Sequence, residues 1–313
     1  MNVNAAVKVG ALFKLDVYKE IGEAPVKSID WFHNIMLDQG LKHLSGTSGH
    51  TFGIDYVAVG SGTSTPVATQ TGLDEYIAST DNIISSAGGR SMSTPMYAFG
   101  RKTFRFPRGA AAGVLGELCL CQLLSIRPDN IFAINRGRIK DALGEPTTLE
   151  VLSDEFLEVT VEFRTYFQEI ISGAFKLMKG SVQVSEHTVT GRCCLTGDPS
   201  SFNIYPCALD QYLNSIISPN PLPAGNSTQP SGGKDFITNH SYADGKVYGS
   251  MRVGLDSGNG YDHKSFFVPI CNILNDGGKN GYMWEITPPI RKTNSQEITY
   301  KLNITWQRYD EGA

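Results

Sequence analysis

The sequence predicts a mainly β protein made of two antiparallel β-sandwich-like domains, with one helix in the first domain and a short helix in the second. Three observations lead to this fold class. The chain of 313 residues contains 33 Gly and 15 Pro, so turns are frequent. Segments rich in β-branched and aromatic residues recur between these turns, which is typical of sandwiches and barrels. The length exceeds that of a usual single domain, and a hydrophobic content of 41% supplies apolar material for a packed core.

The first domain is expected to cover residues 1–168 and to contain one helix near residues 30–45. Asp30 is the expected N-cap of this helix, and apolar residues follow at helical spacing as far as Leu44. Gly46 comes just after the last turn, where a C-terminal glycine is common. The strands predicted for this domain are residues 9–20, 54–59, 75–83, 97–106, 114–124, 131–135 and 156–167.

The second domain is expected to cover residues 169–313. A short helix is predicted at residues 206–217, and a run rich in Pro, Gly, Ser and Asn near residues 218–233 predicts an exposed, mobile loop. The strands predicted for this domain are residues 179–190, 236–239, 246–255, 265–273, 281–286 and 297–306.

Two segments of about a dozen residues resemble one another, residues 155–167 and residues 297–309, and we interpret them as the closing strands of the two domains. The second segment has the cleanest alternation of apolar and polar residues in the chain, which predicts an inner strand with one apolar face toward a core. Its inward residues are expected to be Ile298, Tyr300, Leu302, Ile304 and Trp306.

Charge and hydropathy exclude several kinds of partner. The formal net charge is -4, so the chain as a whole has no electrostatic bias toward nucleic acid or acidic membranes. No window approaches the apolar length of a membrane span, and the first residues lack a basic segment followed by an apolar one. We therefore expect no membrane insertion, no direct nucleic acid contact and no secretory signal.

The cysteines and histidines give no clear metal site. Cys119 and Cys121 share one face of a predicted strand, but a metal site would need two more ligands at a suitable spacing. The other cluster considered is His187 with Cys193, Cys194 and Cys207, whose spacings match no usual zinc pattern. Most of the six cysteines, which include Cys271, are expected to be free thiols.

Catalytic motifs are equally lacking in the sequence. His33 and His43 flank the predicted helix and are interpreted as packing or surface residues. No metalloprotease, serine hydrolase or phosphate-loop pattern occurs, and Gly60-Ser61-Gly62 lacks the third glycine of a dinucleotide loop. We therefore predict that the chain is not an enzyme and has no catalytic residue, cofactor or metal site.

One basic strand stands out, in residues 101–108. Along a strand, Arg101, Thr103 and Arg105 share one face, whereas Lys102, Phe104 and Phe106 share the other. The favoured interpretation is a solvated strand face. The alternatives are contact with an acidic neighbouring subunit or contact with DNA. The net negative charge of the chain disfavours DNA.

Several segments resemble virion structural proteins of tailed bacteriophages, from the neck, the collar or the tail fibres. The most specific begins Gly144-Glu145-Pro146-Thr147-Thr148-Leu149 and ends at Phe163, and further similarity lies in residues 31–41, 56–66 and 291–309. The resemblance implies a virion component, assembled in the host bacterial cytoplasm as a homo-oligomer, that contacts itself and other virion structural proteins. It brings no catalytic residues, and residues 90–121 match little of it.

Three functions were compared. The first is a structural component that builds or decorates the neck, collar or tail and attaches neighbouring subunits or fibres. The second is a tail-fibre module that binds a host surface receptor or glycan. The third is a polysaccharide-degrading enzyme, which the missing repeats and the missing catalytic constellation disfavour. Scaffold and receptor-binding roles would both use edge strands and aromatic-rich loops.

Overall fold

The computed structural model is mainly β, with 60% strand and 3% helix, which confirms the predicted fold class. It has a single helix among the residues it describes. The structure describes residues 2–125, 129–168, 170–179, 181–204, 236–243, 245–256, 259, 262–269, 273–274 and 280–309.

The described residues of the first half form thirteen strands and the helix α1 (Asp38–Leu44). The strands are β1 (Asn2–Tyr18), β2 (Lys27–His33), β3 (Ile35–Met36), β4 (Tyr56–Gly60), β5 (Tyr76–Thr80), β6 (Ile83–Ser91), β7 (Tyr97–Arg105), β8 (Gly113–Leu115), β9 (Glu117–Leu123), β10 (Ile131–Ala133), β11 (Asn135–Arg138), β12 (Leu149–Val151) and β13 (Phe156–Phe167).

The described residues of the second half form seven further strands. These are β14 (Ile170–Lys179), β15 (Val182–Leu195), β16 (Phe236–Ala243), β17 (Lys246–Val253), β18 (Asp262–Pro269), β19 (Asn280–Arg291) and β20 (Ile298–Arg308).

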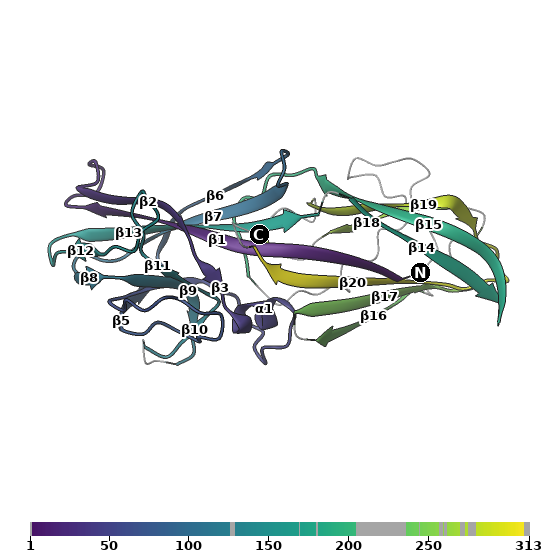
Figure 1. Ribbon diagram of the computed structural model, residues 1–313, viewed down its shortest axis with the longest axis horizontal. Helices are drawn as coiled ribbons and strands as arrows, with labels where there is room; N and C mark the ends of the chain where they lie inside the picture. Colours follow the sequence, from purple (N-terminus) through teal and green to yellow (C-terminus); the bar gives the residue numbers. More distant parts are fainter. Residues whose placement is uncertain are drawn as a thin grey trace.

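The main sheet joins both halves of the chain. Its order is β16-β17-β20-β1-β13-β7-β6, with β2 also paired to β1. The 17-residue strand β1 runs along most of the long axis of the molecule (Figure 1). β13 lies antiparallel on one side of it and β20 lies parallel on the other. The two segments that resemble each other in sequence therefore flank the same strand, and the predicted division at residue 168 crosses a continuous sheet.

Two smaller layers complete the fold on either side of the long axis. The sheet β3-β11-β9-β4-β5, with β10, lies below the main sheet at the left of Figure 1, and the sheet β14-β15-β19-β18 lies at the right. A short pair, β12-β8, lies at the left end. One apolar cluster runs through all these layers, from Val7 of β1 to Leu118 of β9 and Trp284 of β19.

The predicted helix near residues 30–45 is wrong in its first half. β2 and β3 occupy that part, and α1 begins only at Asp38, after Leu37 as its N-cap. Phe32 pairs with Phe13 of β1 and is buried there, so sheet pairing overrides the helical spacing of the apolar residues. The end of the helix is as predicted, since Gly46 follows it with a φ of 78°.

Several predicted strands are divided in the structure. The strand predicted at residues 179–190 is the turn and second arm of a hairpin, β14–β15, which pairs Ile170 with Arg192 and Lys179 with Val182. The segments predicted at residues 75–83 and 114–124 each contain two strands. The helix predicted at residues 206–217 and the loop predicted near residues 218–233 lie outside the described residues.

The closing strand β20 is an inner strand, as predicted. It pairs with β1 on one side and with β17 on the other. Its inward residues Ile298, Tyr300, Ile304 and Trp306 are buried; the side chain of Leu302 lies outside the description. Because β1 belongs to the first half, this strand stabilises both halves.

Candidate functional site

The basic strand of the sequence lies in β7, where carboxylates of the same sheet neutralise two of its arginines. Arg105 lies opposite Glu158 of β13, with 2.9 Å between its Nε and the carboxylate Oε1. Arg101 lies opposite Glu162 in the same way, with 3.0 Å between Nε and Oε2. We call these four residues the charge ladder. Carboxylates of the same chain thus supply the acidic partners of this strand face.

The interpretation of this strand as a solvated face is wrong for Lys102. Its side chain lies on the face of Phe104 and Phe106, which are buried, and Lys102 itself is only 5% exposed. Its Nζ lies 4.7 Å from the ring centroid of Phe202 and 3.5 Å from a carboxylate oxygen of Asp55. Burial lowers the pKa of Lys102 from its usual value, against the opposing effect of Asp55.

The described residues weighed as metal ligands lie in two separate strands, β9 and β15. Cys119 and Cys121 lie buried on one face of β9, and burial raises the pKa of the Cys119 thiol. His187 and Cys193 lie six positions apart along β15, which corresponds to about 20 Å. The described residues contain no group of three or more His, Cys, Asp or Glu side chains that could hold a metal ion, and Cys207 and Cys271 lie outside the description.

The two histidines considered beside the helix have different surroundings. His33 is half-buried in β2. His43 is buried, and its ring nitrogens lie 3.1 Å from the Ser48 hydroxyl and 3.3 Å from the carbonyl oxygen of Ile204. Its ring also stacks on Phe52. Burial lowers the pKa of His43, so the neutral ring is a packing residue that connects the helix to the segment at Ile204.

A buried ionic group that the sequence did not indicate fixes the loop between β4 and β5. Arg136 of β11 donates to the Glu117 carboxylate of β9 at 2.7 Å and to the Asp74 carboxylate at 2.7 Å. It also donates to the Ser64 hydroxyl at 3.2 Å. We call these four residues the Arg136 cluster. The other oxygen of Glu117 accepts the backbone N–H of Gly62 at 3.2 Å, so this carboxylate holds the loop as well as the arginine.

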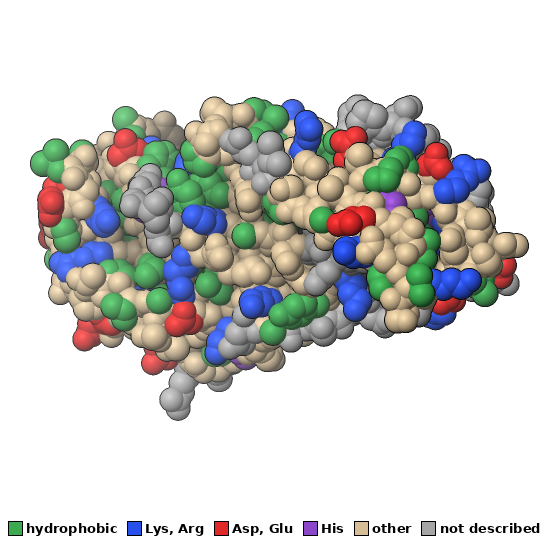
Figure 2. All heavy atoms as spheres, turned by 45° about the vertical axis from the view of Figure 1, so that its right-hand side comes forward, with side chains coloured by type: hydrophobic (Ala, Val, Ile, Leu, Met, Phe, Trp, Pro, Cys, Tyr) green, Lys and Arg blue, Asp and Glu red, His purple; other side chains and the backbone are tan. Residues whose placement is uncertain are grey.

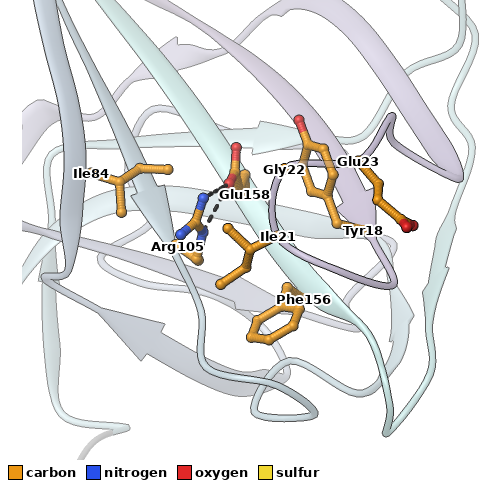
Figure 3. A pocket seen from close by; sticks show the side chains of 8 residues that line it. All are labelled: Tyr18, Ile21, Gly22, Glu23, Ile84, Arg105, Phe156 and Glu158. Carbon is orange, nitrogen blue, oxygen red and sulfur yellow. Dashed lines mark hydrogen bonds and ion pairs between the residues drawn. The ribbon is translucent and has the colours of Figure 1, made fainter.

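A pocket opens where β1 and β7 end and β6 and β13 begin, under the loop that joins β1 to β2 (Figure 3). It has a volume of about 240 Å³, and we call it the end pocket. Its lining residues are Tyr18, Ile21, Gly22, Glu23, Ile84, Arg105, Phe156 and Glu158. Ile21 is 58% exposed and Ile84 is 38% exposed, so the rim offers apolar surface to solvent.

The polar residues of the end pocket are mostly paired. Figure 3 shows the Arg105–Glu158 pair on one wall. Burial, followed by the Glu158 charge, raises the pKa of Tyr18. Arg108 lies 4.6 Å from the ring centroid of Phe156, which leaves that ring less accessible to a ligand. Glu23 is exposed, has no ion pair among the described residues, and points away from the Arg105–Glu158 pair (Figure 3).

A second exposed apolar group lies at the tip of the β14–β15 hairpin, at the other end of the long axis (Figure 1). Met178 is 53% exposed, Val182 is 66% exposed and Val184 is 57% exposed. Val184 is the extra residue where the register of the hairpin shifts, between the pairs Leu177–Ser185 and Met178–Gln183. We call residues 176–179 and 181–186 the hairpin tip.

The hairpin tip also carries basic side chains. Lys176 and Lys179 are exposed, and neither forms an ion pair among the described residues. Glu186 lies opposite Lys176 in the register, so the formal charge of the tip is +1, from two lysines and one glutamate. Figure 2 shows hydrophobic, basic and acidic side chains beside one another on the end of the molecule that carries the hairpin.

Comparisons with protein-family models, with curated proteins and with solved structures find no match to this chain. Among the described residues, no helix has the length and apolar character needed to cross a membrane. Two exposed features of the described residues, the end pocket and the hairpin tip, offer surface to a partner.

Proposed function

We propose that this chain is a structural component of a tailed-bacteriophage particle. In this role it builds or decorates the neck, collar or tail as a homo-oligomer and attaches neighbouring subunits or fibres. It works by shape and contact, without a catalytic step or a cofactor. The sequence resemblance supplies the setting, and the arrangement of strands and exposed side chains supports a scaffold within that setting.

The main sheet has the dimensions and pairing of a stiff support. The 17 residues of β1 correspond to a length of about 56 Å. β13 pairs with this strand over Val7–Tyr18. On the other side, β20 pairs over Asn2–Val9 and β2 pairs over Leu12–Val17. Since β13 and β20 come from different halves of the chain, β1 connects the two halves through backbone hydrogen bonds.

The observation that carries the proposal is the β14–β15 hairpin. β14 is an edge strand with no further pairing partner among the described residues. Soluble proteins usually protect such edges, and an exposed apolar group on one indicates a surface that another chain covers. On β14 itself Met178 is exposed, and Val182 and Val184, the two neighbours of its register partner Gln183 on β15, are exposed as well.

The test is the stoichiometry and position of this chain in the intact particle. Quantitative mass spectrometry of purified particles should give several copies, and a labelled chain should mark a ring or collar in an electron-microscopy map. One or two copies per particle would contradict a homo-oligomeric scaffold. A label at the distal tip of a fibre would favour the receptor-binding alternative instead.

A further inference from the structure

We propose that copies of this chain assemble head to tail, with the hairpin tip of one copy seated in the end pocket of the next. This inference rests on the proposed function and specifies its contact. The occupant of the pocket is a second copy of the same chain, and the contact joins two different surfaces of identical subunits.

The two surfaces lie where a head-to-tail contact requires them. The end pocket is formed by the ends of β1 and β7 and the beginnings of β6 and β13, at one end of the long axis. The hairpin tip lies at the opposite end (Figure 1). A contact between unlike surfaces leaves one free surface of each kind, so it continues from copy to copy until a ring closes or a filament forms.

The apolar surfaces match in form. The tip is a protrusion, with Met178 and Val184 on adjacent strands, whereas the other end is a hollow rimmed by Ile21 and Ile84. An apolar cavity of about 150 Å³ is known to hold a benzene ring, so the 240 Å³ of the end pocket has room for an aliphatic side chain such as that of Met178. The flexible thioether of methionine suits an irregular pocket of this kind.

The charges also match. Lys176 and Lys179 leave the tip with a net positive charge, while Glu23 is a carboxylate without an ion pair at the rim of the pocket. Opposite charges around an apolar contact steer the two surfaces together and fix their orientation. The lysines also oppose the simpler alternative, in which β14 pairs edge to edge with another strand, because lysine on an edge strand disfavours such pairing.

The closing experiment uses two single variants of the full-length chain. Met178→Asp places a charge in the tip, and Ile21→Asp places one in the rim of the pocket; both residues are more than half exposed, so the fold should tolerate the changes. Sedimentation velocity of the wild type should show species larger than a dimer as concentration rises. Each variant alone should remain monomeric, with its association weakened at least about tenfold.

The mixture of the two variants gives the sharpest result. The intact tip of Ile21→Asp fits the intact pocket of Met178→Asp, so an equimolar mixture should form a dimer of one chain of each kind. Growth should stop at two chains, since each partner has lost its other surface. The matched control is Met92→Asp, which changes an exposed methionine in the β6–β7 turn and should assemble like the wild type.

A charge exchange provides an independent readout. Lys179→Glu and Glu23→Lys should each weaken assembly, and the double variant Lys179→Glu/Glu23→Lys should recover it because the opposite charges are restored in reversed order. Loss of assembly in both single variants without recovery in the double variant would overturn the pairing of these two surfaces.

The remaining outcomes separate this inference from the proposed function. If the Met178→Asp variant assembles like the wild type, the inference is contradicted and the scaffold role is left intact. A wild-type chain that stays monomeric at the highest soluble concentration also contradicts it, because both surfaces are present on the isolated chain. The scaffold role itself would be contradicted by a low copy number in the particle or by a label at the distal tip of a fibre.

Discussion

The Arg136 cluster and the charge ladder both pair arginines with carboxylates, but they differ in burial. The Arg136 side chain is 0% exposed and that of its partner Glu117 is 1% exposed. In the ladder, the side chain of Arg101 is 38% exposed and that of Arg105 is 24% exposed. Water can solvate a ladder arginine that loses its partner, whereas Arg136 is shielded from water and would depend on Asp74 and Ser64 alone. An arginine–carboxylate pair should therefore affect the free energy of unfolding strongly in the buried cluster and only weakly in the exposed ladder.

The two groups also connect different parts of the chain. The ladder joins β7 to β13, which are already paired by backbone hydrogen bonds. The Arg136 cluster joins β9 and β11 to the loop between β4 and β5, because Glu117 accepts the backbone N–H groups of Gly62 and Glu75 near the two ends of that loop. Breaking the cluster should therefore release the loop, while breaking the ladder should leave the sheet intact.

The largest effect is expected from Glu117→Ala. The variant removes the buried carboxylate of the pair and leaves Arg136 with the more exposed carboxylate of Asp74. It also unpairs the backbone N–H groups of Gly62 and Glu75, so the free energy of unfolding should fall by about 3–5 kcal/mol. Urea unfolding followed by circular dichroism measures the change. The double variant Glu117→Leu/Arg136→Met is the control, and it should be more stable than Glu117→Ala because no buried charge remains. Equal stability of the two variants would show that the lost charge pairing is not the cause.

Gly62→Ala should have the next largest effect, and it addresses the fit of the loop around the same carboxylate. A Cβ atom at Gly62 would lie 2.2 Å from Oε1 of Glu117, so the loop or the carboxylate must move. Overpacking of this kind costs about 1–3 kcal/mol. Thermal unfolding should show the loss, and Gly144→Ala serves as the contrast, since a Cβ there would meet nothing within 4 Å and only its φ of 83° is unfavourable. A fully stable Gly62→Ala would mean that the Glu117 carboxylate is free to shift.

The sequence predicted the strands better than it predicted either charged group. Residues 97–106, 156–167 and 297–306 were placed almost to the residue because apolar and polar side chains alternate there, and β7, β13 and β20 follow them closely. The helix failed over Phe32 because the pairing of β2 with β1, a contact between segments that the local pattern does not connect, decides that region.

The Arg136 cluster could not be assembled from the sequence, because Ser64, Asp74, Glu117 and Arg136 lie far apart along the chain. A signal was nevertheless present, since Glu117 interrupts a strongly apolar segment and Arg136 follows another. A charge at an inward position of such a strand indicates a buried partner. The end pocket and the hairpin tip depend on which loops the topology brings to the ends of the molecule, and no local pattern contains that information.

Arg101→Gln should have a small effect, which tests the exposed side of the comparison. The carboxylate of Glu162 keeps a second partner, since Arg164 Nε lies 2.7 Å from its other oxygen. Partly exposed pairs contribute about 0.2–1 kcal/mol, so the loss of stability should stay below about 1 kcal/mol and should shrink further at high salt. Urea unfolding at low and high salt provides the measurement. A loss as large as that of Glu117→Ala would remove the distinction between ladder and cluster.

The smallest effect at neutral pH is expected for His43. This residue is buried as a neutral ring, whereas Arg136 is buried as a charged group with an ionic partner. Burial lowers the pKa of His43 in the folded protein below its usual value of about 6.5. The unfolded chain therefore binds a proton at a higher pH than the folded chain does, and stability rises with pH in this range. As the pH falls through about 6.5 toward the lower folded-state pKa, the protein should lose stability, because a protonated ring would have to form next to Phe52 without solvent.

Unfolding free energies measured across this range should show that slope in the wild type. His43→Gln keeps a polar side chain but cannot titrate, so its stability should depend less on pH, even though the variant is less stable at every pH. An equally steep slope in His43→Gln would assign the pH dependence to other groups and would leave the contact between His43 and the Ile204 carbonyl as a purely neutral packing feature.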